Sequence, residues 1–179
     1  MDDIDEQPRL GPKDADKSIV AFEDPSCPSC RRFETRVFPR IKSQLVEPGR
    51  LSFYFRVYPV VYPWGEPAAK ALEATYARDE SVFWDLKDHY YANQGSFGTQ
   101  NVLRKTEDYL NSNTQLDGSS VVEDVRAGTY DDEVRSDYRA GQAAGANATP
   151  TFYLFSSGEL VTKVVGPQSY TVFKNSLGL

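Results

Sequence analysis

The chain of 179 residues contains only two cysteines, and both belong to one motif, Cys27-Pro28-Ser29-Cys30. Two thiols cannot close two disulfides or supply a four-thiolate metal site. The motif lies where an apolar run ends and an amphipathic stretch begins. A thiol at a helix N-terminus is stabilised as the thiolate by unpaired backbone N–H groups and by the positive end of the helix dipole. We therefore predict a redox pair in which Cys27 attacks and Cys30, one helical turn later, resolves the mixed disulfide.

Two other uses of the motif fit the sequence less well. The same spacing supplies half of a zinc site, but zinc needs two further ligands. The single histidine, His89, lies far along the chain in an aromatic stretch, so carboxylates would have to complete such a site. A purely structural disulfide is disfavoured because so short a loop removes little entropy from the unfolded chain. We predict no metal and no cofactor.

Composition limits the partners. The net charge is -6, and no basic face is visible, which disfavours nucleic acid as a partner. No apolar run approaches the roughly 18 residues that would indicate a membrane span. The length fits one domain, or one domain with a large insertion. We expect a soluble monomer.

The N-terminal segment from Asp2 to Lys17 is acidic, contains prolines and has few large apolar residues. Such a composition predicts a flexible arm or tether. The segment has neither the basic flank nor the apolar core of a signal peptide. Two interpretations stay open: a mature secreted or tethered fragment whose leader is absent, and a cytosolic protein with an acidic start.

The hydrophobic pattern changes in order along the first third of the chain. Ser18 to Phe22 is short, apolar and partly β-branched, which predicts a buried strand. Apolar residues every fourth position then predict a helix from Pro28 to Val46, kinked at Pro39. Leu51 to Tyr58 alternates well enough to be the next strand. A strand, a helix and a strand in this order predict a parallel pair joined by a right-handed crossover.

Helical patterns dominate the middle of the chain. Five helices are predicted between Gly, Asn, Asp and Ser residues, over 67–77, 81–92, 101–110, 119–127 and 131–144. Ser81 is the expected N-cap of the second. Residues 151–155 and 160–165 then predict a β-hairpin, and residues 169–177 a closing helix.

Three separated segments carry a family resemblance. They are Phe22-Glu23-Asp24-Pro25-Ser26-Cys27-Pro28-Ser29-Cys30-Arg31, residues 83–94 and Ala148-Thr149-Pro150-Thr151-Phe152-Tyr153-Leu154. In order, they resemble the active-site turn, the aromatic helix of the inserted domain and the cis-proline segment of the DsbA-like thiol oxidoreductases. The resemblance implies an α/β thioredoxin fold, a mixed central sheet with flanking helices, interrupted by an all-helical subdomain. Its implied boundaries are a flexible arm over 1–17, a thioredoxin-like domain over 18–65 and 146–179, and the helical insertion over 66–145.

The resemblance also implies the site. A cis bond before Pro150 would present the backbone of Thr149 on the Cys27 side, where it can hydrogen-bond an extended substrate peptide as an added strand. The expected catalytic pair is Cys27 and Cys30, and the expected supporting residues are Pro28, Ser29, Asp24, Thr149 and Pro150.

One position departs from the family pattern. Many relatives carry a buried acid six residues before the first cysteine, where this chain has Ala21. Strand alternation does not place Glu23 or Asp24 in that position. The sequence therefore leaves proton transfer at Cys30 to water or to Asp24.

These features predict a thiol-disulfide oxidoreductase. We expect a dithiol oxidase of moderate strength that donates its Cys27–Cys30 disulfide to reduced or misoxidised substrate proteins outside the cytoplasm, with a redox partner that regenerates it. A cytoplasmic location is the alternative. Two other functions are kept: a reductase or isomerase on the same fold, and a peptide-binding, chaperone-like module in which the dithiol is incidental.

Four further groups have a structural and a functional interpretation. Arg31 and Arg32 either add positive potential beside the thiolate or are solvated. Residues 58–64 either line a peptide groove or form a rigid connection. His89 is expected to pack within the insertion rather than act as an acid or base, and residues 131–133 to start a helix rather than bind calcium.

Overall fold

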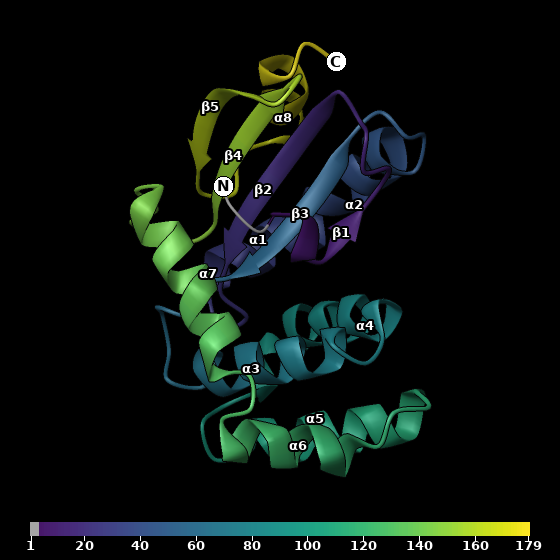
Figure 1. Cartoon of the computed structure of the whole chain (residues 1–179), viewed down its shortest axis with the longest axis vertical. Helices are drawn as coiled ribbons and strands as arrows, with labels where there is room; N and C mark the ends of the chain where they lie inside the picture. The colour runs from purple at the N-terminus through teal and green to yellow at the C-terminus, as the bar shows by residue number, and fades with distance from the viewer. Residues whose placement is uncertain (1–3) are drawn as a thin grey trace.

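A five-stranded mixed sheet forms the centre of the computed structural model, which describes residues 4–179 (Figure 1). The strand order is β1–β3–β2–β4–β5. β2 and β3 are parallel, and every other neighbouring pair is antiparallel. The predicted parallel pair and the predicted hairpin are both confirmed. The strands are β1 (Arg9–Leu10), β2 (Lys17–Glu23), β3 (Ser52–Val57), β4 (Thr151–Ser156) and β5 (Glu159–Val165).

The stretch predicted as one kinked helix forms three pieces. They are α1 (Pro28–Arg36), α2 (Phe38–Ile41) and a π-helical turn over Lys42–Val46. The interruption falls at Val37, just before Pro39, which lacks the N–H needed to continue the helix and crowds the preceding turn. The kink is therefore confirmed, and it is sharp enough to end α1.

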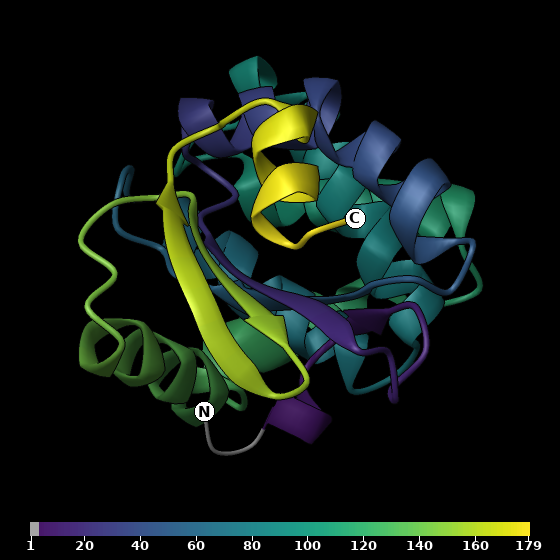
Figure 2. The ribbon, with the colours of Figure 1, turned by 90° about the horizontal axis from the view of Figure 1, so that it is seen from above.

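The two faces of the sheet are buried by different helices, as Figure 2 shows. In β2, Ile19 and Ala21 face the layer that contains α1 and α8 (Tyr170–Ser176), where Phe33 and Phe173 pack on Phe152. Val20 and Phe22 lie in a second apolar cluster on the other face, with the end of α7. Alternate residues of β2 thus enter two separate parts of the core.

The remaining helices form a layer beyond one end of the sheet (Figure 1). All five predicted helices are present, with ends shifted by a few residues. The prediction of Ser81 as N-cap is wrong: Asp79 caps α4 and accepts hydrogen bonds from the N–H groups of Ser81 (2.8 Å) and Val82 (3.3 Å). The helices are α3 (Gly65–Tyr76), α4 (Glu80–Ala92), a 3-10 turn over Gln94–Ser96, α5 (Val102–Asn113), α6 (Gly118–Ala127) and α7 (Asp131–Ala143).

The last of these helices, α7, returns to the sheet. Its Asp137 pairs with Arg56 of β3 at 2.8 Å and also accepts the N–H of Val57 at 2.9 Å, with both charged side chains buried. Because each charge is paired and hydrogen-bonded, the contact fixes the geometry of α7 against β3.

The prediction of a flexible arm over residues 1–17 is wrong for the part that the structure describes. Arg9 and Leu10 form β1, and Phe55 donates its N–H to the carbonyl of Pro8 at 3.1 Å. Gly11 follows at φ +89°, where an added Cβ would lie 2.3 Å from the Leu51 carbonyl oxygen. The segment is ordered because it satisfies the open edge of β3, which composition alone does not reveal. Residues 1–3 lie outside the described part.

Candidate active site

Asp24 organises the turn between β2 and α1. Its Oδ1 accepts hydrogen bonds from the N–H (2.7 Å) and the hydroxyl (2.6 Å) of Ser26, and its Oδ2 accepts the N–H groups of Val60 (2.8 Å) and Val61 (2.7 Å). Burial raises the pKa of the Asp24 carboxyl. Since both oxygens are fully used as acceptors, Asp24 holds the turn and the segment after β3 rather than standing free to carry a proton.

Gly65 allows this close packing. A Cβ at this position would lie 2.5 Å from Oδ1 of Asp24 and 2.8 Å from the hydroxyl of Ser26. The same hydroxyl accepts the N–H of Tyr62 at 3.0 Å. The segment predicted as either a groove or a rigid connection is therefore anchored through the backbone of Val60, Val61 and Tyr62, whose side chains are exposed.

Cys27 is the N-cap of α1 and is only 4% exposed. Its Sγ accepts the N–H of Cys30 at 3.4 Å and lies 3.4 Å from the carbonyl oxygen of Thr149. The peptide bond between Thr149 and Pro150 is cis. A hydrogen bond from the Cys30 thiol, with smaller contributions from the Thr149 side chain and from the backbone N–H groups of Cys30 and Ser29, lowers the pKa of Cys27 to about 6 despite its burial.

Cys30 has the opposite environment. It is fully buried, and its pKa is raised well above the usual range, first by burial and then by its interaction with Cys27 and the charge of Glu23. Both thiols are free in this structure. The structure thus brings together one stabilised thiolate and one buried, protonated thiol.

A buried ionic cluster lies behind Cys30. Lys87 of α4 contacts Glu34 of α1 through a short ion pair and Asp88 at 2.8 Å. Glu23, at the end of β2, is completely buried, and neither of its oxygens has a hydrogen-bond partner among the described residues. Burial, followed by the charge of Glu34, raises the pKa of Glu23 well above its usual range. The buried carboxyl groups of Glu23 and Glu34 therefore share the ammonium group of Lys87.

The position of Glu23 corrects the sequence interpretation. Odd-numbered residues of β2 face α1, so Glu23 shares the face of Ala21, one strand period nearer to the cysteines. The acid absent at Ala21 has a counterpart at Glu23. Asp24 turns away into the loop network instead.

The helical layer also reaches the active-site turn. Gln94, just after α4, donates from Nε2 to the carbonyl oxygens of Pro25 (2.8 Å) and Cys27 (3.0 Å). Arg31 donates from Nε to the carbonyl oxygen of Tyr91 at 3.1 Å. Side chains from both parts of the chain thus fix the backbone around Cys27.

The sequence and the fold of this protein are similar to those of known proteins. The sequence matches the thioredoxin family over residues 3–169. Over 153 residues it is 29% identical to a probable disulfide bond formation protein D of Bacillus cereus, covering 83% of this chain and 69% of that protein. The chain belongs to the DsbA-like thiol-disulfide oxidoreductases of the thioredoxin family.

Solved structures agree with this assignment. Oxidised BdbD of Bacillus subtilis superposes with a TM-score of 0.85 at 25% identity, covering 98% of this chain and 95% of that one. The α-DsbA1 protein of Wolbachia pipientis shares the fold, with a TM-score of 0.78 at 19% identity over 94% of this chain and 87% of that one. The predicted thioredoxin fold with a helical insertion is therefore confirmed.

Three residues of this DsbA-like site were not predicted from the sequence. Lys87 could have been predicted, because it lies on the buried face of α4 between Phe83 and Tyr90, where a lysine needs a buried partner. Glu34 lies on the same face of α1 as Cys30, one turn further on. Gln94 follows the end of its helix and had no such signal.

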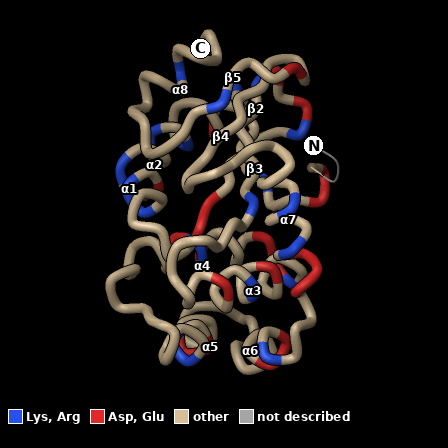
Figure 3. Tube along the Cα trace, turned by 90° about the vertical axis from the view of Figure 1, so that its left-hand side faces the viewer, with Lys and Arg blue, Asp and Glu red and all other residues tan. Residues whose placement is uncertain are grey.

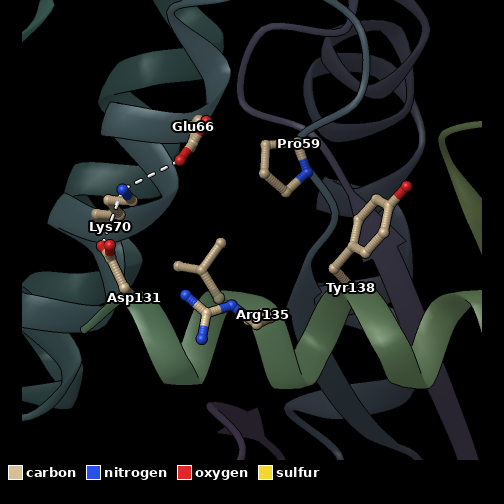
Figure 4. A pocket seen from close by; sticks show the side chains of 7 residues that line it. Pro59, Glu66, Lys70, Asp131, Arg135 and Tyr138 are labelled. Carbon is tan, nitrogen blue, oxygen red and sulfur yellow. Dashed lines mark ion pairs between the residues drawn. The ribbon is translucent and has the colours of Figure 1, made fainter. Parts of the chain in front are cut away.

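The remaining candidates are structural. His89 stacks on Tyr109 with ring centroids 3.9 Å apart and contacts Asn93, so it packs within the helical layer as predicted. Asp131 begins α7 and pairs with Lys70 at 2.8 Å, and Lys70 also contacts Glu66 at 3.0 Å, beside a cavity of about 250 Å³ (Figure 4). Among residues 4–179, no group of three or more His, Cys, Asp or Glu is arranged to hold a metal ion.

Titration of the reduced enzyme tests the stabilised thiolate. Absorbance near 240 nm should rise with a midpoint near pH 6, the pKa of Cys27. Because this pKa lies below the value of an unfolded thiol, 9.0, the thiolate stabilises the reduced fold at high pH, and this contribution is lost as the pH falls through about 6. The melting temperature of the reduced form should therefore rise relative to that of the oxidised form as the pH is increased from about 6 to 9. A midpoint near 9 would contradict the geometry described for Cys27.

Proposed function

We propose that this protein is a dithiol oxidase that transfers its Cys27–Cys30 disulfide to reduced client proteins. The lowered pKa of Cys27 is the observation that carries the proposal. Stabilising the thiolate stabilises the reduced form, which makes the disulfide a better oxidant. The printed names of the Bacillus relatives, disulfide bond formation protein D, support the same direction.

The reaction balances as two thiol-disulfide exchanges. A client thiolate attacks Sγ of Cys27, the Cys27–Cys30 bond breaks, and Cys30 leaves and takes up a proton. A second client thiolate then attacks the client sulfur, and Cys27 leaves as a thiolate. The client loses two electrons and gains a disulfide, and the enzyme becomes a dithiol. In the reverse direction Cys27 attacks and Cys30 resolves.

We propose Glu23 as the group that supplies the proton to Cys30. Its carboxyl group is buried, burial and the charge of Glu34 raise its pKa well above the usual range, and it interacts electrostatically with the Cys30 thiol. A buried thiolate leaving group without a proton donor would be costly to form. Lys87 and Glu34 set the electrostatic environment of this acid.

Replacing Glu23 with Gln should slow the first exchange because glutamine cannot donate that proton. We expect a loss on the order of 100-fold in the rate of mixed-disulfide formation near neutral pH. Rapid-quench gels of oxidised enzyme with a monothiol peptide measure this rate. Glu73→Gln is the matched control, since Glu73 is also a buried carboxyl whose pKa is raised, to about 8, but it lies in α3 among Asp137 and Glu133. Equal rates for the two variants would remove Glu23 from the proposed path.

The direction of transfer is tested by the reduction potential of the Cys27–Cys30 couple, measured by equilibration with glutathione. We expect a value well above the roughly -270 mV of thioredoxin and toward the roughly -120 mV of strong oxidases. A value at or below that of thioredoxin would make this enzyme a reductase.

We further propose that the protein works outside the cytoplasm, with clients that are newly exported and a partner that reoxidises it. Disulfides persist in oxidising compartments and are reduced in the cytosol. None of the helices in residues 4–179 combines the length and the apolar character of a membrane span. Labelling of Cys27 in intact cells by a thiol reagent that cannot cross membranes tests the location.

A further inference from the structure

The helices that follow Cys27 carry a row of arginines that no acidic residue offsets. Between Pro28 and Val46 the chain has five basic residues and one acidic residue, although its net charge is -6. The one acid, Glu34, is buried and belongs to Lys87. Figure 3 shows the basic residues gathered along α1 and α2. The acidic protein thus has a locally cationic surface directly beside its reactive cysteine.

The exposed arginines of this row are Arg31, Arg32, Arg36 and Arg40. Their partners among the described residues are neutral: the Tyr91 carbonyl for Arg31, the Ser29 hydroxyl for Arg32, and the Gln44 side chain and Tyr170 ring for Arg40. Cations without acidic partners keep their attraction for an incoming anion.

Two cavities adjoin on this surface. One, of about 350 Å³, is lined by Pro28, Arg31, Arg32, Thr35 and Arg36. The other, of about 470 Å³, shares Pro28 and Arg31 and continues over the opposite side of the turn. Pro28, which directly follows Cys27, lines both cavities, and Ser26, which precedes it, also lines the larger one, so both cavities adjoin the reactive turn.

The larger cavity is mainly apolar. Trp64 and Phe97 stack with ring centroids 5.5 Å apart, and Tyr62 and Pro63 lie beside them. The polar residues of its lining are Ser26, Arg31, Gln94 and Thr99. Gly98 forms part of the lining, and a Cβ added there would meet no atom within 4 Å. This part of the surface has room for a large apolar side chain.

We propose that the two cavities form one client groove, and that it selects unfolded polypeptide with acidic residues on one side of the reacting cysteine and an apolar side chain on the other. The inference rests on the proposed oxidase function and assigns its substrate class. The groove adjoins the turn that carries Cys27, so a chain bound in it can present its thiol to Cys27. Its cationic half complements carboxylates, and its aromatic half complements an apolar side chain. Nucleic acid fits poorly, because the rest of the protein is strongly acidic and the second half of the groove is apolar.

The test uses short monothiol peptides that are identical except at the flanks of the cysteine. One flank carries two Asp or two Lys, the other carries Phe or Ser, and each peptide is made in both orders. The rate of mixed-disulfide formation with oxidised enzyme is divided by the rate with hydroxyethyl disulfide, which corrects for the thiol pKa of each peptide. At low salt we expect the Asp peptide to react about 10-fold faster than the Lys peptide, and the ratio to fall toward one in 0.5 M NaCl, where the screening length is only about 4 Å.

Matched variants locate the effect. Arg32→Glu with Arg36→Glu should bring the Asp-to-Lys ratio to one or below. Arg126→Glu with Arg139→Glu makes the same charge change at exposed sites in α6 and α7 and should leave the ratio unchanged. Gly98→Leu should remove the preference for Phe over Ser and leave the charge preference intact.

The outcomes separate the two proposals. Reaction with every peptide at a ratio near one, or equal ratios for the two arginine double variants, overturns the groove and leaves the oxidase standing. A preference shared by a duplex oligonucleotide that competes with the Asp peptide would make the groove a general anion site and also overturn the proposal. Consumption of dithiothreitol with no reaction of any peptide would overturn both.

Discussion

Replacing Cys30 with Ser should convert this enzyme into a trap for its clients. Cys27 then remains able to attack the disulfide of an oxidised client, forming a mixed disulfide and releasing a client thiol, but no thiol stands beside it to break that bond. Serine is the informative substitution because its hydroxyl can still donate a hydrogen bond to Sγ of Cys27, the largest cause of the lowered pKa. We expect turnover to fall to background while covalent adducts accumulate. Non-reducing gels of the Cys30→Ser protein, recovered from cells or mixed with a client that carries a disulfide, measure this directly.

The partner variant gives the opposite pattern. Cys27→Ser should lose turnover as completely, yet form no adducts, because the remaining thiol is fully buried and its pKa is raised. Adducts on Cys27→Ser that equal those on Cys30→Ser would show that the roles of the two thiols have been assigned in the wrong order.

Replacing Lys87 with Met should produce the largest loss of stability of any single substitution considered for this protein. Lys87 is buried in contact with Glu34 and lies within 6 Å of four aromatic rings, including those of Phe38 and Trp84. Methionine fills similar space but leaves Glu34 and Glu23 in the core without a cation. Breaking one side of a buried pair typically costs about 3–5 kcal/mol. Urea unfolding near pH 7 measures the change.

The pH dependence of this loss has a defined sign. Without Lys87, the pKa of Glu34 rises further above its usual value of 4.5, and an acid whose pKa is raised by folding loses stability as pH increases above that value. The deficit of Lys87→Met should therefore grow from about pH 4.5 toward neutrality and shrink when Glu34→Gln is added. Arg104→Gln, which breaks an exposed pair with Asp108, is the control and should cost at most about 1 kcal/mol. Similar losses for the two variants would mean that Lys87 contributes no more than a surface charge.

The fold was accessible from the sequence because most of its elements follow local rules. The parallel strands, the interruption at Pro39 and the hairpin each depend on residues that lie close together in the chain. Ser81 was misread as a cap because Asp79, two residues earlier, offers a carboxylate to the same N–H groups. The N-terminal strand could not be read, because its order comes from the edge of β3 rather than from its own composition.

The site was accessible only in part. Cys27 and Cys30 are marked by their spacing, whereas the contacts of Glu23, Lys87 and Gln94 join segments far apart in the chain. Strand alternation places Glu23 on the same face of β2 as Ala21, and this could be derived from the sequence. It indicates a role for Glu23 only once the face of β2 that meets α1 is known. Long-range partners of this kind need the tertiary arrangement.

The contact of Gln94 has a consequence for anyone who would shorten this protein. An excised thioredoxin-like core would retain both cysteines and the sheet, yet the carbonyl oxygens of Pro25 and Cys27 would lose their shared donor. The helical insertion thus supports the backbone of the reactive turn. A minimal redox protein built from this chain would need another hydrogen-bond donor in place of the Gln94 amide before its activity could be compared with that of the full protein.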